Sequence, residues 1–114
     1  MKRFLLATAI SLCATAALAD PAGQYDVEGT SPDGSTYRGT AAIERTGDTF
    51  RVTWLIGKDK FIGTAVGNDD FFAVAYRSGN STGIAAYGRE GDGWIGVWTY
   101  TGGKQVGAER LTPR

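Results

Sequence analysis

The sequence predicts an all-β protein that folds as an eight-stranded antiparallel up-and-down barrel. Turn signals recur about every 10 to 13 residues, the segments between them alternate apolar and polar residues, and no segment has the spacing of a long amphipathic helix. In each signal Gly lies beside Asp, Asn, Ser or Lys, which suit tight turns. The signals lie at 31–35, 46–48, 57–59, 67–70, 78–81, 90–93 and 101–103, the last being followed by Lys104. Eight strands with short connections can close into a barrel without free edges. The alternative is a two-sheet β-sandwich.

Residues 1–19 precede the predicted domain and have the pattern of a secretory signal peptide. Lys2 and Arg3 form a cationic start, an apolar run continues to Leu18, and Ala17-Leu18-Ala19 fits a cleavage site. The apolar run is about 15 residues long, whereas a membrane-spanning helix needs roughly 20. We therefore expect cleavage before Asp20, a periplasmic or secreted protein, and no stable membrane insertion.

The predicted domain spans residues 20–114, and its first three strands alternate clearly. Charged residues and threonines occupy the positions expected to face solvent. The residues expected to face inward are Tyr25, Val27 and Gly29 in the first strand, Tyr37, Gly39, Ala41 and Ile43 in the second, and Phe50, Val52, Trp54 and Ile56 in the third.

The middle strands, at about 61–66, 71–77 and 82–89, alternate less cleanly. Four apolar residues fall on their nominal outer face: Ile62, Val66, Phe71 and Ile84. A bulge, a covered patch or an interface would each explain this placement. If exposed, the four residues form a candidate protein-contact patch.

Three of the even-numbered or late strands repeat a pairing of an aromatic residue with glycine. An aromatic-x-Gly pattern begins at Tyr37, at Phe61 and at Trp94. Glycine normally weakens a strand, so its repeated inward placement needs a reason. In a small, sharply coiled barrel, inward glycines give room to neighbouring aromatic rings.

In the last strand, Glu109 shares a face with Gly107 and Leu111. If this face is interior, the carboxylate is buried and needs a partner such as a tyrosine hydroxyl, an indole N–H or an arginine. If the strand frays or is offset by one residue, Glu109 lies in water. The sequence leaves both alternatives open.

Composition argues against catalysis and against several partners. The chain has no histidine, the commonest general base and metal ligand, and its one cysteine, Cys13, lies in the predicted leader. The chain has 12 basic and 12 acidic residues, and removal of the leader with Lys2 and Arg3 leaves a net charge of about −2. The remaining basic residues form no cluster of the kind that binds nucleic acid. The acidic turns lack the spacing of a calcium loop. We expect a non-enzymatic protein without metal or cofactor.

The aromatic residues are the strongest compositional feature. Ten can face inward in one register: Tyr25, Tyr37, Phe50, Trp54, Phe61, Tyr76, Tyr87, Trp94, Trp98 and Tyr100. These rings either fill the barrel, which is the expectation for so short a chain, or line a pocket for an apolar or planar ligand. The candidate ligand-binding residues are Tyr37, Trp54, Tyr76, Tyr87, Trp94, Trp98 and Glu109.

Three stretches carry a resemblance to a known family: residues 23–39, Phe50-Arg51-Val52-Thr53-Trp54, and Gly93-Trp94-Ile95-Gly96-Val97-Trp98-Thr99-Tyr100. Together they resemble a family of small exported alphaproteobacterial proteins that is often labelled fibronectin-binding. The resemblance covers nearly the whole mature domain. It implies an envelope or secreted protein with a host-matrix partner, and it brings no catalytic motif.

The strand rhythm and the late tryptophans also resemble the avidin and lipocalin barrels. The chain departs from the lipocalin start, where Gly-x-Trp is expected and Gly23-Gln24-Tyr25 stands. No ligand can be transferred on a likeness of fold. The favoured hypothesis is a small barrel that binds an apolar ligand, followed by a protein binder such as an adhesin or inhibitor, and then by an enzyme.

Overall fold

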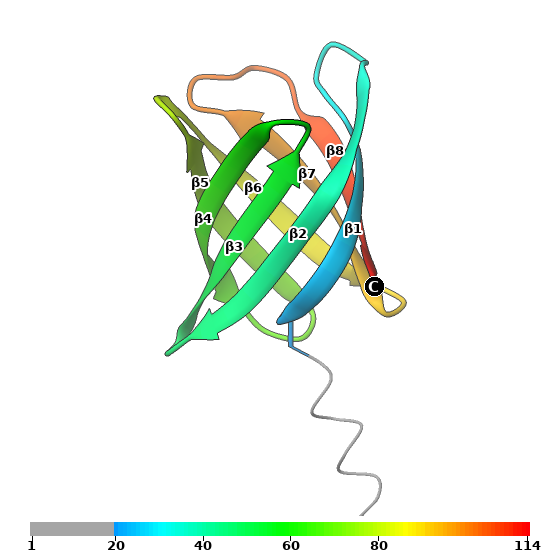
Figure 1. Ribbon diagram of the computed structural model, residues 1–114, viewed down its shortest axis with the longest axis vertical. Helices are drawn as coiled ribbons and strands as arrows, with labels where there is room; N and C mark the ends of the chain where they lie inside the picture. Colours follow the sequence, from blue (N-terminus) through cyan, green and yellow to red (C-terminus); the bar gives the residue numbers. More distant parts are fainter. Residues whose placement is uncertain (1–19) are drawn as a thin grey trace, which may run out of the picture.

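The computed structural model describes residues 20–114, which form eight strands and their connections (Figure 1). The strands are β1 (Gly23–Thr30), β2 (Thr36–Thr46), β3 (Thr49–Ile56), β4 (Asp59–Gly67), β5 (Phe71–Ser78), β6 (Ser81–Glu90), β7 (Gly93–Tyr100) and β8 (Gly107–Pro113). Among the residues described, no helix has the length and apolar character needed to cross a membrane. The predicted signal peptide, with Cys13, lies outside the described residues.

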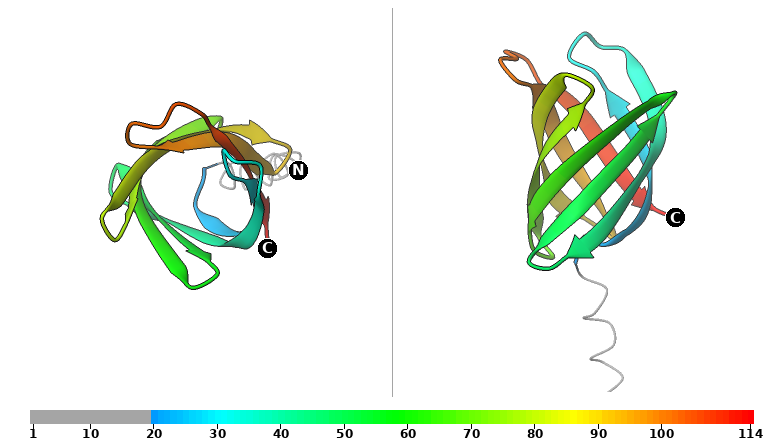
Figure 2. Two further views of the ribbon diagram at one scale, coloured as in Figure 1. Left: turned by 90° about the horizontal axis from the view of Figure 1, so that it is seen from above. Right: turned by 60° about the vertical axis from the view of Figure 1, so that its left-hand side comes forward.

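The strands form one closed antiparallel barrel in sequence order. Each strand pairs with the next, and β8 pairs back with β1, where Val27 lies opposite Leu111. Seen along the barrel, the strands form a closed ring (Figure 2). The predicted up-and-down barrel is confirmed, and the alternative sandwich is wrong.

Four of the predicted turns are two-residue hairpin connections that begin with glycine. Gly47, Gly57, Gly79 and Gly91 have φ values of 76°, 63°, 60° and 61°, and no residue other than glycine has a positive φ among residues 20–114. A positive φ at only the first central residue is typical of a type II′ turn, whose twist matches that of the flanking strands. These glycines therefore allow adjacent strands to pair directly.

One end of the barrel is filled with side chains. We call this end the filled half and define it by Tyr25, Ile43, Phe50, Phe72, Trp94 and Leu111, which are all buried. The Tyr25 hydroxyl donates a 2.7 Å hydrogen bond to the Pro21 carbonyl and accepts a 3.3 Å bond from Trp94 Nε1. Pro21 is itself buried, so the segment before β1 helps to close this end of the barrel.

The outer surface differs between the two sides of the barrel. Over β1 and β2 it carries ion pairs such as Arg38 with Glu28 at 3.1 Å, and Arg110 of β8 pairs with Glu90 at the end of β6. Over β4 to β7 it carries exposed apolar residues, and strand pairing there continues without interruption. The uneven alternation of the middle strands therefore reflects an apolar outer face and not a bulge.

Candidate functional site

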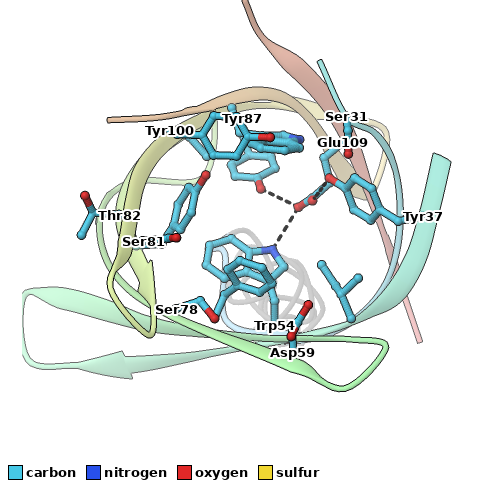
Figure 3. Close-up of a pocket in the computed structure, with 15 residues that line it drawn as sticks. Ser31, Tyr37, Trp54, Asp59, Ser78, Ser81, Thr82, Tyr87, Tyr100 and Glu109 are labelled. Atoms are coloured by element: carbon cyan, nitrogen blue, oxygen red, sulfur yellow. Dashed lines mark hydrogen bonds between the residues drawn. The ribbon is translucent and has the colours of Figure 1, made fainter. Parts of the chain in front are cut away.

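The other end of the barrel, which we call the open half, holds a cavity of about 510 Å³. Side chains from many strands surround it (Figure 3). The cavity is lined by Ser31, Tyr37, Trp54, Ile56, Asp59, Phe61, Tyr76, Ser78, Ser81, Thr82, Ala85, Tyr87, Trp98, Tyr100 and Glu109. Its size lies within the range of roughly 300–1,000 Å³ that is usual for small-molecule pockets.

Glu109 lies in the wall of this cavity with only 6% of its surface exposed. Its Oε1 accepts a 2.6 Å hydrogen bond from the Tyr37 hydroxyl. Its Oε2 accepts a 2.6 Å bond from the Tyr87 hydroxyl and a 3.0 Å bond from Trp54 Nε1 (Figure 3). Of the two placements that the sequence left open, the buried one is correct, because β8 keeps its pairing and alternation through Pro113.

Strand register explains how two tyrosines reach this carboxylate. Across five adjacent strands, one row reads Tyr37, Gly29, Glu109, Gly96 and Tyr87. A glycine therefore separates Glu109 from each tyrosine. A Cβ on Gly29 would lie 2.2 Å from the Tyr37 ring, and one on Gly96 would lie 2.5 Å from the Tyr87 ring. Because these two glycines have no side chain, the Tyr37 and Tyr87 rings extend across them and reach Glu109.

The same arrangement recurs at the other rings of the open half. A Cβ on Gly83 would lie 2.4 Å from the Tyr76 ring, and one on Gly107 would lie 2.5 Å from the Trp98 ring. In both cases the glycine is the register partner of the aromatic residue. The prediction that inward glycines make room for aromatic rings is confirmed.

The rings hold one another in edge-to-face contacts. Tyr76 packs in this way against Trp54 at 5.7 Å between ring centroids and against Phe61 at 6.0 Å. Trp98 does so with Tyr37 at 6.2 Å and with Tyr100 at 5.5 Å. Such pairs stabilise a fold beyond their buried area, so the aromatic lining is held in position by its own contacts.

Burial controls the protonation of the cluster. It raises the pKa of Glu109, while the hydrogen bonds from Tyr37, Tyr87 and Trp54 oppose this by stabilising the carboxylate. Burial and the nearby carboxylate also raise the pKa values of Tyr37 and Tyr87, so both hydroxyls stay neutral donors at physiological pH. Because the folded pKa of Glu109 is raised, its contribution to stability falls as the pH rises through that value.

One polar atom beside the cavity has no hydrogen-bond partner. Nε1 of Trp98 is buried and makes no hydrogen bond of ordinary geometry among the described residues, although it lies close enough to the Tyr37 hydroxyl to oppose the rise in the pKa of that tyrosine. Tyr76 differs, since its hydroxyl donates a 3.1 Å bond to the Thr99 carbonyl. Its pKa is raised to about 12, mainly by burial, and it too remains protonated.

The structure brings together six of the seven candidate ligand-binding residues: Tyr37, Trp54, Tyr76, Tyr87, Trp98 and Glu109. Trp94 is the exception. It is completely buried in the filled half, against Phe72 at 4.8 Å between ring centroids, and does not line the cavity. That the six residues bind a ligand stays a prediction.

Several residues that line the cavity lie outside the predicted candidate set. Phe61 and Tyr100 are predicted inward rings without an assigned role in the site, and the polar residues at the open end of the cavity are not predicted at all: Ser31, Asp59, Ser78, Ser81 and Thr82. These polar residues lie at strand ends or turns on the side of the barrel away from Trp94. Only the closed fold shows which turns surround the open end of the barrel, so the strand pattern alone does not identify these residues.

The candidate protein-contact patch lies on the outer face, as expected, but not as one group. Val66 and Ile84 are 58% and 61% exposed and line a shallow outer groove with Val97 and Val106. Phe71 is exposed and Ile62 is half-buried, and neither lines this groove.

Within residues 20–114, no three His, Cys, Asp or Glu side chains gather closely enough to hold a metal ion.

No protein-family model matches the chain, and no curated protein matches it significantly. The resemblance to the family labelled fibronectin-binding therefore stays a prediction. A solved structure described as the de novo design of a fluorescence-activating β-barrel is similar, with a TM-score of 0.63, 14% identity, and coverage of 82% of this chain and 93% of the design. At this identity the likeness supports the barrel fold alone.

Proposed function

We propose that this protein binds a small, largely aromatic or apolar molecule in the open half of its barrel. The observation that carries the proposal is the division of one barrel into a filled half and an aromatic cavity of about 510 Å³ with a single buried carboxylate in its wall. A pocket with many apolar surfaces and few well-placed polar groups is the usual form of a small-molecule site. The similar designed barrel, described as fluorescence-activating, offers a parallel in shape.

We propose a binding role and not a catalytic one. The three groups that contact Glu109 are neutral ring donors, which hold its carboxylate in one position. This arrangement suits recognition of a ligand group. We also propose that the protein works in the periplasm or outside the cell, on the strength of the leader-like sequence at residues 1–19.

Two neighbouring alanines on β6 provide a matched test of the site. Ala85 is buried and lines the cavity, whereas Ala86 lies on the outer face. We expect Ala85→Leu to weaken binding of 2-naphthylmethanol at least tenfold, about 1.4 kcal/mol, because the added side chain occupies the cavity. Calorimetry of the wild-type protein and the two variants measures the effect.

Ala86→Leu is the control, since it adds the same atoms to the same strand outside the cavity. We expect it to keep the wild-type affinity, and thermal unfolding of both variants checks that the barrel persists. Equal affinities in the three folded proteins would contradict the proposed site.

A second candidate function is protein binding through the outer groove. The groove places the exposed side chains of Val66, Ile84, Val97 and Val106 on one side of the barrel. Apolar surface of this kind is typical of contact sites for other proteins. The partner would be a host-matrix protein, if the protein is an adhesin, or the target protein, if it is an inhibitor. Because Ala86 lies in this groove, Ala86→Leu would alter protein binding and leave ligand binding unchanged.

A further inference from the structure

We infer that the ligand is a small organic cation, whose ammonium or amidinium group pairs with Glu109 while its apolar body lies against the rings of the open half. This inference rests on the proposed function, because it names the chemical class that the same cavity takes. Three features of the cavity support it: its charge, the free acceptor capacity of Glu109, and the aromatic side chains around it.

The charged residues of the cavity are all acidic. Glu109 lies deep in it and Asp59 lies among its lining residues, while no lysine or arginine lines it among the described residues. The contacts of Glu109 are two hydroxyls and one indole N–H, which carry no charge. A buried carboxylate is costly unless its charge is compensated, and a cationic ligand would supply the missing positive charge.

The carboxylate also has room for another donor. A carboxylate accepts about four hydrogen bonds, two at each oxygen. Oε2 of Glu109 accepts two, from Trp54 and Tyr87, whereas Oε1 accepts only one, from Tyr37. A ligand N–H can use the remaining position on Oε1. A charge-assisted bond of this kind is roughly twice as strong as a neutral one.

The surrounding rings favour the same type of ligand. Indole and phenol rings carry negative potential on their faces and attract ammonium groups, most strongly where water is excluded. Trp54, Tyr76 and Trp98 belong to the lining around Glu109, and Trp54 is 4% exposed. A neutral molecule of the same shape gains the apolar contact with these rings but neither the attraction of their faces nor the ion pair.

The inference carries a dependence on pH. The titratable groups that face Glu109 are Tyr37, Tyr76 and Tyr87, whose raised pKa values keep them neutral, and Asp59 and Tyr100 also line the cavity. Burial raises the pKa of Glu109 above its ordinary value. As the pH falls through that pKa, Glu109 takes up a proton and its pairing with a cation is lost.

Three probes that share one ring system and differ in charge test the inference: 2-naphthylmethylamine, 2-naphthylmethanol and 2-naphthylacetate. We expect calorimetry at about pH 7 to show that the amine binds the wild-type protein at least tenfold more tightly than the alcohol, since 1.4 kcal/mol is a factor of ten. The acetate should bind most weakly. In Glu109→Gln, the ratio of amine to alcohol affinity should fall close to one.

Glu28→Gln is the matched control. It removes the same charge from the outer surface, where Glu28 pairs with the exposed Arg38, and should keep the wild-type ratio. If Glu109→Gln fails to fold, the ratio is measured on the wild-type protein over the range of pH in which the barrel stays folded, and we expect it to fall as the pH falls through the raised pKa of Glu109. A ratio that stays constant would overturn the inference.

The outcomes separate the two proposals. If none of the three probes binds, the proposed function fails and the inference fails with it. If the alcohol binds the wild-type protein as tightly as the amine, or the acetate binds more tightly than either, the inference is overturned and the proposed function stands. A tenfold preference that survives Glu109→Gln would also overturn the assignment to Glu109.

Discussion

Replacing Trp94 with alanine is expected to lower the free energy of unfolding by about 3–5 kcal/mol, the usual cost of removing a buried tryptophan. Trp94 is completely buried, packs edge-to-face on Phe72, and donates a hydrogen bond to the Tyr25 hydroxyl. The Arg89 guanidinium lies 4.1 Å from its ring centre. Small domains have about 5–15 kcal/mol of stability in total, so the loss takes a large share. Urea unfolding followed by circular dichroism measures it.

Ile95→Ala is the control for this change. Ile95 follows Trp94 on β7 but points outward and is 42% exposed. We expect its replacement to cost less than about 1 kcal/mol, as surface substitutions usually do. Similar losses for the two variants would show that the filled half does not stabilise the barrel in the way described.

Replacing Gly96 with alanine is expected to lower the free energy of unfolding by about 2–4 kcal/mol, from overpacking and from a weakened hydrogen bond to a buried charge. The new Cβ would lie 2.4 Å from the Ala86 carbonyl oxygen and 2.5 Å from the Tyr87 ring. The Tyr87 ring must then move, and its 2.6 Å bond to Glu109 is disturbed. Denaturant unfolding, with binding of 2-naphthylmethanol as a second readout, measures both consequences.

Gly88→Ala serves as the comparison, because Gly88 lies on β6, the strand that pairs with the β7 strand of Gly96. A Cβ there would meet no heavy atom within 4 Å, and its φ is not in the left-handed region. We expect this variant to be neutral or stabilised by up to about 1 kcal/mol, since alanine restricts the unfolded chain. A Gly96→Ala protein as stable as Gly88→Ala would contradict the role of the glycine row.

The barrel could be predicted from local features of the sequence. Four two-residue turns begin with glycine at a positive φ, and the strands between turns place apolar residues on one face. Both signals act over a few residues, so they are visible without knowledge of the fold. The pairing of inward glycines with aromatic rings was predictable for the same reason, although the partner of each ring was not.

The cluster around Glu109 could not be predicted, because its members are far apart in the sequence. Tyr37 lies 72 residues from Glu109 and Trp54 lies 55 residues from it. They meet only after β8 closes against β1 with Gly29 opposite Glu109. The alternation of β8 placed Glu109 on the inner face but could not give the stagger between strands, which decides the row in which each side chain lies.

The division of the barrel into two halves was also beyond the sequence. The sequence predicts that the rings fill the interior, and this is correct for Tyr25, Phe50 and Trp94 but wrong for the end lined by Tyr76 and Trp98. All of these side chains point inward, so the alternation of side chains along a strand cannot distinguish those that fill the barrel from those that line the cavity. Their height along the barrel separates them, and that height again depends on the stagger of the strands.

The three tryptophans allow the most direct test of ligand binding in the open half. Trp54 and Trp98 line the cavity, whereas Trp94 lies in the filled half. Each indole N–H gives its own resonance in a nitrogen–proton NMR spectrum, and the protein is titrated with 2-naphthylmethanol. Binding in the open half predicts that the Trp54 and Trp98 resonances shift in a saturable way while the Trp94 resonance stays in place. Unchanged Trp54 and Trp98 resonances, or an equal shift of all three, would contradict it.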